Sequence, residues 1–358
     1  MIRFESVTKR YADGTTAVDN LSLEVPRGGI TVLVGPSGCG KTTSLRMINR
    51  MVEPTSGRIL LDGDDVSERP AAQLRRSIGY VIQHAGLFPH RTVLANVMTV
   101  PRLLGWDRGR ARTAAMEALE KVGLTADQAR RYPAQLSGGQ QQRVGVARAL
   151  ASGPELVLMD EPFSAVDPIV RGDLQEEVRR LQRELGITVV LVTHDIDEAL
   201  TLGDQVAVMR HGGHLAQFAP PAELLAEPED DFVAGFVGKD RGYRALGFAR
   251  PDLPLREEAT VQLGQPVVAG AGWVLVADGG GAPLGWVDVN GWGGPVPEGR
   301  LHRLGTLAEV DASARTLLDA ALSSPSGRGV VVDDGRVVGT VTADEVLAAT
   351  LRARSGES

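Results

Sequence analysis

One short segment constrains the fold of this chain more than any other. Residues 35–42 read Gly-Pro-Ser-Gly-Cys-Gly-Lys-Thr, which is the pattern of a phosphate-binding loop. The segment follows the apolar run 30–34 and precedes a helical pattern through Arg50, which is the strand–loop–helix order that such a loop requires. Its glycines allow backbone N–H groups to converge on phosphate oxygens, and the dipole of the helix favours the anion. The sequence therefore predicts a nucleotide site here.

The loop also assigns roles to individual residues. Lys41 can reach the β and γ phosphates of a nucleotide, and the hydroxyl of Thr42 can be a ligand of Mg²⁺. Cys39 is small, so its side chain should matter little to a cradle made of backbone groups. The residues of this segment predicted to bind ATP are Gly35, Pro36, Ser37, Gly38, Cys39, Gly40, Lys41, Thr42 and Thr43.

The pattern around the loop predicts the fold class. Residues 1–237 alternate short β-branched apolar runs with longer helical patterns, which is typical of an α/β domain with a largely parallel sheet. The runs 30–34, 156–159 and 187–192 are continuously apolar, as expected of strands that are covered on both faces. We therefore expect a nucleotide-binding α/β domain over residues 1–237.

Two further features complete the expected domain. Between Gln83 and Tyr132 the strand signal fades and helical patterns dominate, which predicts an inserted helical subdomain at about residues 84–135. In residues 205–218 the run Val-Ala-Val-Met, the turn His-Gly-Gly and the run His-Leu-Ala-Gln-Phe follow one another, which predicts a hairpin at the end of the domain.

Two acidic residues follow the apolar run 156–159. Asp160 stands at the carboxyl end of a buried strand, where it can hold Mg²⁺ directly or through water. Glu161 can accept a proton from the water that attacks the γ phosphate. Taken alone, this pair is also compatible with a surface turn before Pro162, but the phosphate loop makes that alternative a minor one.

A second small-residue segment precedes the helical stretch 144–151. Ser137, Gly138, Gly139 and Gln140 follow Leu136, and Ser137 is a suitable helix N-cap. A serine and two glycines at a helix N-terminus also make a second phosphate cradle. Since one ATP does not need two such loops so far apart in the chain, the pair predicts a head-to-tail dimer that encloses two nucleotides.

With these motifs in this order, residues 1–237 resemble the ATP-binding subunits of ABC transporters. The resemblance implies that Ser164-Ala165-Val166-Asp167 couples the two sites of a dimer, and that Gln83 senses Mg²⁺ and the attacking water and abuts a membrane partner. It also implies that His194 contacts the γ phosphate and that Tyr11 stacks on adenine. The implied catalytic residues are Glu161, His194 and Gln83; further nucleotide contacts are Tyr11, Ser137, Gly138, Gly139, Gln140 and Asp167; and the Mg²⁺ ligands are Thr42, Gln83 and Asp160.

Finer resemblance concerns the transported solute. Residues 193–199, 236–241 and 163–169 look like the corresponding segments of ATPases that serve glycine betaine, carnitine, choline and proline importers. This implies an ATP hydrolase that works with a transmembrane permease, a second copy of itself and an extracytoplasmic solute-binding protein. The ATPase of a sugar or other solute importer and a soluble non-transport ABC ATPase remain alternatives.

Residues 238–358 differ in composition from the rest of the chain. They contain 20 of the 43 glycines. Residues 330–347 predict strand, turn, strand and helix, similar to the second half of a CBS domain, and 271–289 repeat this pattern weakly. We expect a small α+β regulatory domain, a degenerate CBS pair. A diverged hairpin pair without a ligand and the small barrel of sugar-importer ATPases are the alternatives.

The same resemblance argues against nucleotide binding by this C-terminal region. CBS domains that bind adenosine usually have an aspartate three positions after a threonine. Here Thr342 is followed at that spacing by Glu345, and Asp288 of the weaker repeat by Gly291.

Composition excludes several other classes. No apolar stretch approaches the ~20 residues of a membrane span, and the N-terminus does not resemble a secretory signal. A single cysteine excludes an intramolecular disulfide, and a net charge of −7 without a basic patch gives no support for nucleic-acid binding. We expect a cytoplasmic protein at the inner face of the cell membrane.

Overall fold

The structure is a computed structural model, and it describes residues 1–83, 85–164 and 166–355. The chain divides into two compact units, Met1–Gly238 and Lys239–Ser358. Two positions of interest lie outside the described residues: His84, at the start of the expected helical subdomain, and Ala165, in the segment expected to couple two sites. Among the described residues, no helix is both long enough and apolar enough to cross a lipid bilayer.

The first unit is built on a six-stranded sheet with the order β10-β9-β3-β8-β7-β6. Strands β9, β3, β8, β7 and β6 run parallel, and β10 pairs antiparallel with β9, which confirms the predicted hairpin. All residues of β3, β7 and β8 are buried, as their continuously apolar sequences predict. The strands are β3 Ile30–Val34, β6 Ile78–Val81, β7 Leu156–Asp160, β8 Thr188–Thr193, β9 Gln205–Arg210 and β10 His214–Ala219.

A second, antiparallel sheet has the order β2-β1-β4-β5. Its strands are β1 Ile2–Arg10, β2 Thr16–Val25, β4 Ser56–Leu61 and β5 Asp64–Asp65. Helix α1 (Lys41–Ile48) contacts β2 of this sheet and β7 and β8 of the six-stranded sheet. Phe4, Leu45 and Val190 belong to one buried cluster, so the helix that follows the phosphate loop is held in the main core of the unit.

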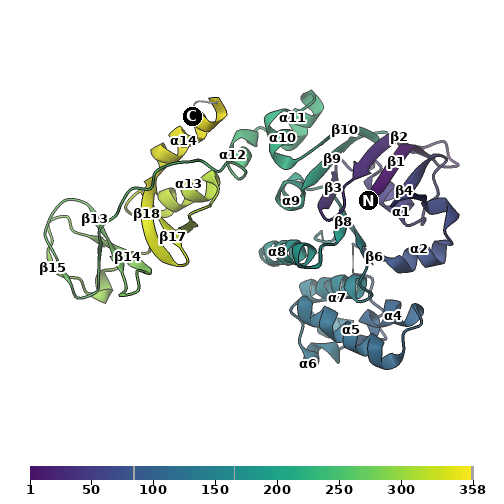
Figure 1. The fold of residues 1–358 in the computed structure, drawn as a ribbon, viewed down its shortest axis with the longest axis horizontal. Helices are drawn as coiled ribbons and strands as arrows, with labels where there is room; N and C mark the ends of the chain where they lie inside the picture. The colour runs from purple at the N-terminus through teal and green to yellow at the C-terminus, as the bar shows by residue number, and fades with distance from the viewer. Residues whose placement is uncertain (84, 165, 356–358) are drawn as a thin grey trace. The chain divides into compact units, whose positions relative to one another are not determined.

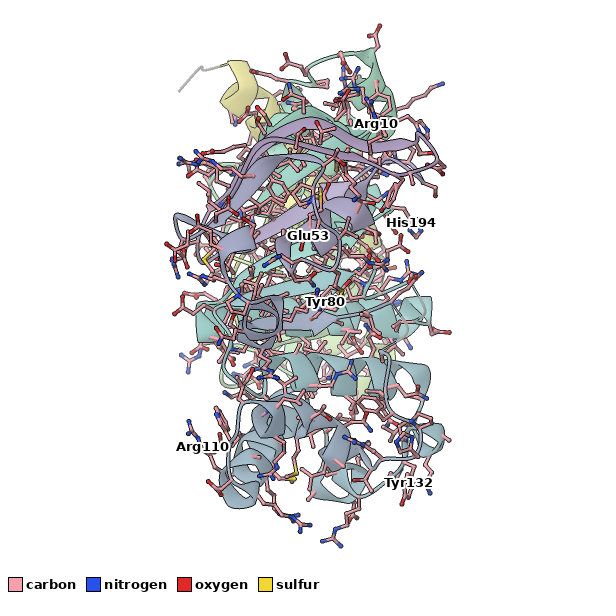
Figure 2. All side chains as sticks on the ribbon, turned by 90° about the vertical axis from the view of Figure 1, so that its right-hand side faces the viewer. Arg10, Glu53, Tyr80, Arg110, Tyr132 and His194 are labelled. Atoms are coloured by element: carbon pink, nitrogen blue, oxygen red, sulfur yellow. The ribbon has the colours of Figure 1, made fainter. Side chains whose placement is uncertain are left out.

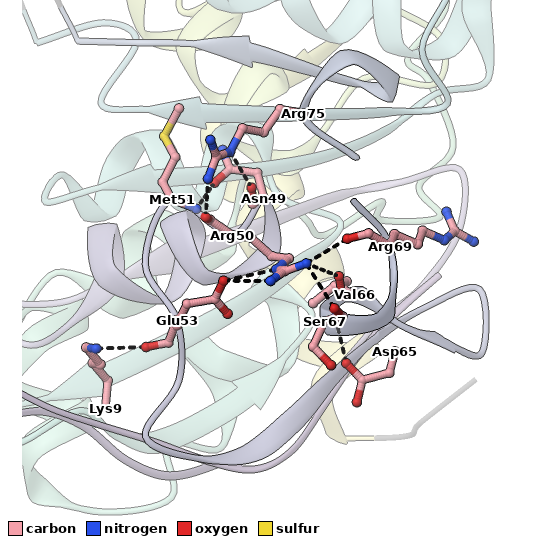
Figure 3. Close-up of polar contacts among 10 residues, drawn as sticks. All are labelled: Lys9, Asn49, Arg50, Met51, Glu53, Asp65, Val66, Ser67, Arg69 and Arg75. Atoms are coloured by element: carbon pink, nitrogen blue, oxygen red, sulfur yellow. Dashed lines mark hydrogen bonds and ion pairs between the residues drawn. The ribbon is translucent and has the colours of Figure 1, made fainter. Parts of the chain in front are cut away.

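Arg50, two residues after α1, anchors the C-terminal end of the helix by hydrogen bonds. Its guanidinium donates to the carbonyl oxygens of Ser67 at 2.9 Å and Arg69 at 2.6 Å, and to the carboxylate of Glu53 (Figure 3). Arg75 of α2 (Ala71–Ser77) donates to the carbonyl of Asn49 at 3.2 Å. Because α1 begins at Lys41, these bonds also fix the helix that presents the phosphate loop.

A group of helices is inserted in the sequence between β6 and β7, which are neighbouring strands of the sheet. Figure 1 shows α4, α5, α6 and α7 together, away from β1, β2 and β4. The helices are α3 Val93–Val97, α4 Thr99–Leu103, α5 Arg108–Lys121, α6 Ala126–Ala129 and α7 Gly138–Leu150, with short 3₁₀ turns at Val66–Glu68 and Pro133–Gln135. The unit is completed by α8 Pro168–Leu185, α9 Ile196–Leu202, α10 Pro221–Ala226 and α11 Asp231–Val237.

The second unit contains two three-stranded sheets of the same topology. In the first, β11 is parallel to β13, which forms a hairpin with β14; in the second, β16 is parallel to β17, which forms a hairpin with β18. Both hairpins shift register one residue beyond a valine–glycine pair, Val276↔Gly285 and Val331↔Gly339. The strands are β11 Thr260–Val261, β12 Pro266–Val267, β13 Trp273–Ala277, β14 Pro283–Asp288, β15 Gly294–Pro295, β16 Ala308–Glu309, β17 Arg328–Asp333 and β18 Arg336–Thr342.

The two sheets also exchange single residues. Arg256, before the first sheet, bridges to Thr340 of the second, and His302, before the second sheet, bridges to Trp286 of the first. In the described residues, the second sheet has helices next to its strands, α13 (Ala314–Ser323) between β16 and β17 and α14 (Ala343–Ser355) after β18. The first sheet is followed instead by the short strand β15 and a 3₁₀ turn, Glu298–Arg300. With α12 (Arg241–Ala245), the unit is an α+β region made of two unequal repeats.

Candidate active site

The phosphate loop connects β3 to α1, as the sequence predicts. Two of its glycines are required by their surroundings. A Cβ atom on Gly35 would lie 2.2 Å from the carbonyl oxygen of Met209, and one on Gly40 would lie 2.1 Å from that of Ala17. Gly38 has a φ of +78° and nothing within 4 Å of the Cβ position, so it faces open space. The loop is therefore close to the backbone on one side and open on the other.

Lys41 is buried within this loop. Its ammonium group donates to the carbonyl oxygens of Gly35 at 2.7 Å and Pro36 at 2.9 Å, and it lies 3.7 Å from the sulfur of Cys39. In the described part of the chain, no acidic side chain forms an ion pair with it. A buried cation bonded only to neutral groups is poorly stabilised by the protein alone, which fits a site for an anion.

Asp160 ends β7 directly opposite the start of α1. Its carboxylate accepts hydrogen bonds from the hydroxyl of Thr42 at 2.9 Å, from Arg46 at 3.3 Å and from the hydroxyl of Tyr80 at 3.4 Å. The Asp160 side chain is 8% exposed. Burial, and secondarily the charge of Asp160, raises the pKa of the Tyr80 phenol, which keeps that group a hydrogen-bond donor.

Glu161 has an unusual backbone conformation. Its φ is +45°, in the left-handed region that glutamate rarely adopts, while its N–H donates to the carbonyl of Val192 on β8 at 3.0 Å. One carboxylate oxygen, Oε2, accepts from the amide of Gln83 at 3.2 Å and lies 3.4 Å from Nδ1 of His194. The His194 side chain is 58% exposed and lies at the surface of the first unit (Figure 2). The structure thus brings three predicted catalytic residues to one carboxylate oxygen.

The remaining predicted residues lie apart from this cluster. Ser137 caps α7: its hydroxyl accepts from the N–H of Gln140 at 3.3 Å, and the Gln140 side chain accepts from the N–H of Ser137 at 3.1 Å. Gly138 and Gly139 form the first turn of α7. Within the described residues of one chain, no hydrogen bond joins this segment to the phosphate loop.

Two further predicted contacts are exposed. The ring of Tyr11 is exposed, with the ammonium of Lys9 5.2 Å from its centroid. Asp167 immediately precedes α8, and its carbonyl accepts from the N–H of Arg171 at 2.9 Å.

The donor set of the site fits ATP and Mg²⁺. A hydroxyl and a carboxylate 2.9 Å apart, Thr42 and Asp160, are the hard oxygen ligands that Mg²⁺ prefers. In the described residues, no group of three or more His, Cys, Asp or Glu side chains is arranged to hold a metal. An incomplete protein set suits Mg²⁺, which usually takes one or two protein ligands and completes its shell with phosphate oxygens and water.

Sequence reasoning missed several residues that support this site. Arg46 and Tyr80 both bond to Asp160, although no motif identifies them. Arg148 of α7 donates to the carbonyls of Ala85 at 2.6 Å and Gly86 at 2.7 Å, so α7 holds the loop that follows Gln83. Burial lowers the pKa of the Arg148 guanidinium. Only Tyr80 stands out in the sequence, as a phenol in the otherwise apolar strand β6, because α1 and α7 carry several other polar residues.

A phosphate loop between a buried strand and a helix, with an acidic strand end against its threonine, defines the class of phosphate-loop nucleotide hydrolases. Comparison with known proteins narrows this class. The pattern of the ABC transporter family matches residues 18–164. The osmoprotectant import ATP-binding protein OsmV of Salmonella typhimurium is 42% identical, over 97% of this chain and 95% of the relative. This chain belongs to the ATP-binding proteins of ABC transporters, and its enzymatic activity is ATP hydrolysis.

Other relatives match a smaller share of the chain. The glycine betaine/carnitine/choline transport ATP-binding protein OpuCA of Bacillus subtilis is 48% identical, over 72% of this chain and 67% of the relative. The Fe(3+) ions import ATP-binding protein FbpC of Brucella abortus is 47% identical, over 66% of each chain. The ATP-binding cassette MJ0796, solved as a dimer bound to ADP and phosphate, is 34% identical with a TM-score of 0.56 and covers 62% of this chain and 99% of its own.

Proposed function

We propose that this chain is the ATP-hydrolysing subunit of an importer for quaternary-amine osmoprotectants such as glycine betaine, choline, carnitine or proline. The observation that carries the proposal is the similarity to OsmV, an osmoprotectant import protein, because it extends over 97% of the chain and so includes the second unit. The ATPase would energise a separate membrane permease.

Identity over about two thirds of the chain does not by itself select the solute. OpuCA and the iron importer protein FbpC are 48% and 47% identical over 72% and 66% of the chain, so relatives named for different solutes match with nearly equal identity. An iron or sugar importer is therefore the second candidate. The match to OsmV favours the osmoprotectant candidate, because it covers 97% of the chain and therefore includes the second unit.

We further propose that one nucleotide binds at each phosphate loop. Lys41 would exchange its bonds to the carbonyls of Gly35 and Pro36 for phosphate oxygens, and N–H groups of residues 35–43 would hold the rest of the anion. Thr42, Asp160 and Gln83 would hold Mg²⁺, which when bound withdraws negative charge from the phosphates. Tyr11, whose ring is exposed, would stack on adenine.

Hydrolysis would be carried out at the Glu161 cluster. Glu161 would take a proton from a water molecule while the oxygen of that water attacks the γ phosphorus. The bond between the γ phosphorus and the β–γ bridging oxygen breaks, which releases ADP and phosphate. Gln83 and His194 lie 3.2 and 3.4 Å from the same carboxylate oxygen, a position from which they can orient the water and the γ phosphate. Most of the rate should come from this electrostatic positioning.

A second copy of the chain would complete each site. Ser137, Gly138, Gly139 and Gln140 of the partner subunit are proposed to face the nucleotide, with Asp167 beside the interface. In favour of this, the N-terminus of α7 carries small residues, and the related cassette MJ0796 forms a dimer in a post-hydrolysis state. The loop that follows Gln83, held by Arg148, would contact the permease.

The second unit is proposed to be a degenerate CBS pair with a regulatory role. Its two sheets share a topology, a bulge position and a reciprocal exchange of one residue, which supports an internal duplication. Both carboxylate oxygens of Glu345 are already used, by Arg256 at 2.9 Å and by the N–H and hydroxyl of Thr342 at 2.8 Å. We therefore do not expect this position to bind a ribose.

In the assembled system we place this chain at the inner face of the cell membrane, with the permease and an extracytoplasmic solute-binding protein. The test is uptake of radiolabelled glycine betaine, choline and carnitine, with maltose and ferric ion as the competing candidates. Cells that carry the chain with its permease should accumulate a quaternary amine, and cells with Glu161→Gln should not. Accumulation of maltose or iron instead would contradict the osmoprotectant assignment.

A further inference from the structure

The turn that carries His194 is fixed on both sides by one hydrogen-bonded network. Thr193, before the histidine, donates its hydroxyl to Oε2 of Glu198 at 2.6 Å. The same hydroxyl accepts from the N–H of Asp195, after the histidine, at 3.0 Å. The position of His194 therefore depends on where Thr193, Asp195 and Glu198 lie.

Glu198 is an unusual anchor because it is an acid in the interior. Its side chain is 6% exposed, and burial, followed by the nearby charge of Asp195, raises its pKa, while the hydroxyl of Thr193 and the charge of Arg171 oppose that shift. Asp195 is the N-cap of α9 and Glu198 lies in its first turn, so the two carboxylates repel each other unless a cation lies between them. The only cation that the described residues place within 4.0 Å of both is Arg171.

Arg171 belongs to α8 and reaches the turn from another element. Its Nη1 lies 3.6 Å from Oδ2 of Asp195 and 3.8 Å from Oε1 of Glu198, too far for full hydrogen bonds to either. Its buried Nε has no hydrogen-bond partner among the described residues. The guanidinium is thus held between two acids by charge, and a small shift would let it bond fully to one of them.

We propose that Arg171 is a positioning residue for ATP hydrolysis, which with Glu198 holds the His194 turn against Glu161. The inference rests on the proposed roles of Glu161 and His194. Arg171 acts from the first turn of α8, directly after Asp167, so any displacement of that segment is transmitted to the histidine. In this proposal, Arg171 sets the distance between Nδ1 of His194 and Oε2 of Glu161, which is 3.4 Å.

Steady-state ATP hydrolysis by the full chain tests this role. Arg171→Met should lower kcat about tenfold, because a small misplacement of a group at the reacting centre is costly, and should leave KM for ATP within about twofold. Arg171→Lys should recover most of the loss, since the contacts seen depend on charge rather than on a paired hydrogen bond. Arg183→Met is the matched control: Arg183 is an exposed arginine of the same helix, and kcat should not change.

A double variant separates positioning from general stability. If Arg171 acts through the histidine, adding Arg171→Met to His194→Ala should lower kcat by less than about twofold further. Asp195→Asn perturbs the same network at a second residue and keeps a helix-capping side chain. It should lower kcat about threefold when His194 is present and should have no further effect in the His194→Ala variant.

Two outcomes would overturn the inference alone: an Arg171→Met enzyme with native kcat, or an equal tenfold loss with and without His194. A native chain that hydrolyses no ATP would instead overturn the proposed function and the inference with it.

Discussion

Two glutamates that accept a hydrogen bond from a threonine hydroxyl, one in each unit, show how differently the units use their charges. Glu198 of the first unit is buried, and its burial raises its pKa. Glu345 of the second unit accepts from the backbone and hydroxyl of Thr342 and from Arg256, and these bonds lower its pKa. Burial therefore makes the charged form of Glu198 costly to stability, whereas the charged form of Glu345 adds to stability.

Backbone strain follows the same division. Glu161 and Asp334 are both non-glycine residues in the left-handed region, with φ of +45° and +49°. Asp334 precedes Gly335 in the tight turn between β17 and β18, where this conformation is what a two-residue hairpin requires. Glu161 does not lie in a hairpin turn. Its N–H donates to the carbonyl of Val192, and its carbonyl accepts from the N–H of Ser164. At these two positions, the left-handed residue of the first unit lies where chemistry is expected, while that of the second unit lies where a hairpin turn requires it.

The largest expected effect tests the chemical half of this comparison. Glu161→Gln should lower ATP hydrolysis by about 10²- to 10⁴-fold, because it removes the proposed base and retains the shape of the side chain. Nucleotide binding should persist, and gel filtration with ATP should detect a trapped dimer. Lys41→Ala is the contrasting variant, since it should weaken nucleotide binding itself. Near-normal hydrolysis by the glutamine variant would remove Glu161 from the role of base.

The next largest effect concerns the folding of the second unit. Arg328 pairs with Glu258 at 3.0 Å, and the Glu258 side chain is 8% exposed. Removing one member alone, as in Arg328→Met, leaves a buried charge and should destabilise this unit by about 3–5 kcal/mol. Denaturation followed by tryptophan fluorescence reports it, since Trp286 lies 4.9 Å from the Arg328 guanidinium. The exposed pair Arg3–Glu24 is the control, at about 1 kcal/mol or less, and an equal cost for both pairs would contradict the prediction.

A smaller effect compares the two strained positions directly. Glu161→Gly should stabilise the first unit by about 0.5–1 kcal/mol, because the relief of a left-handed glutamate exceeds the entropy that glycine loses on folding. Asp334→Gly should change stability little, since aspartate tolerates this conformation in a turn. Chemical denaturation measures both. A loss of stability in the Glu161 variant would show that its backbone is not strained.

The smallest effect is a pH dependence of opposite sign in the two units. The folded-state pKa of Glu198 is raised above its ordinary value of 4.5, so its contribution to stability is present below pH 4.5 and is lost as the pH rises through the folded value. The pKa of Glu345 is lowered from 4.5, so its contribution is present above that pH and is lost as the pH falls through the folded value. Glu198→Gln and Glu345→Gln should therefore change the pH profile of unfolding in opposite directions. Shifts of the same sign would contradict the comparison.

The parts of the fold that follow from local pattern were predictable. The buried strands and the β9–β10 hairpin could be predicted, because a few neighbouring residues carry the whole signal for each of them. The approach of Thr42 to Asp160 also follows from pattern, since β3 and β7 both pair with β8 in parallel and their carboxyl ends meet at one edge.

What depends on packing between distant elements was not predictable. Arg171 of α8 reaches Asp195, the N-cap of α9, across two elements that are separate in the sequence, and no local residue pattern specifies that approach. The bonds from Arg148 to the loop after Gln83 have the same character. In the second unit, the exchange of Arg256 and His302 between sheets involves one residue each, too little to leave a periodic signal.

The position of the only cysteine in the chain has a practical consequence. Cys39 belongs to the phosphate loop, and its side chain is buried 3.7 Å from the ammonium of Lys41; burial raises the pKa of its thiol. Since alkylating reagents attack the exposed thiolate, modification has to wait until the loop opens. The rate of alkylation therefore depends on how often the loop opens, and a bound nucleotide should lower that rate. The protein carries its own chemical reporter of loop motion, with no label to engineer and no second thiol to confuse the signal.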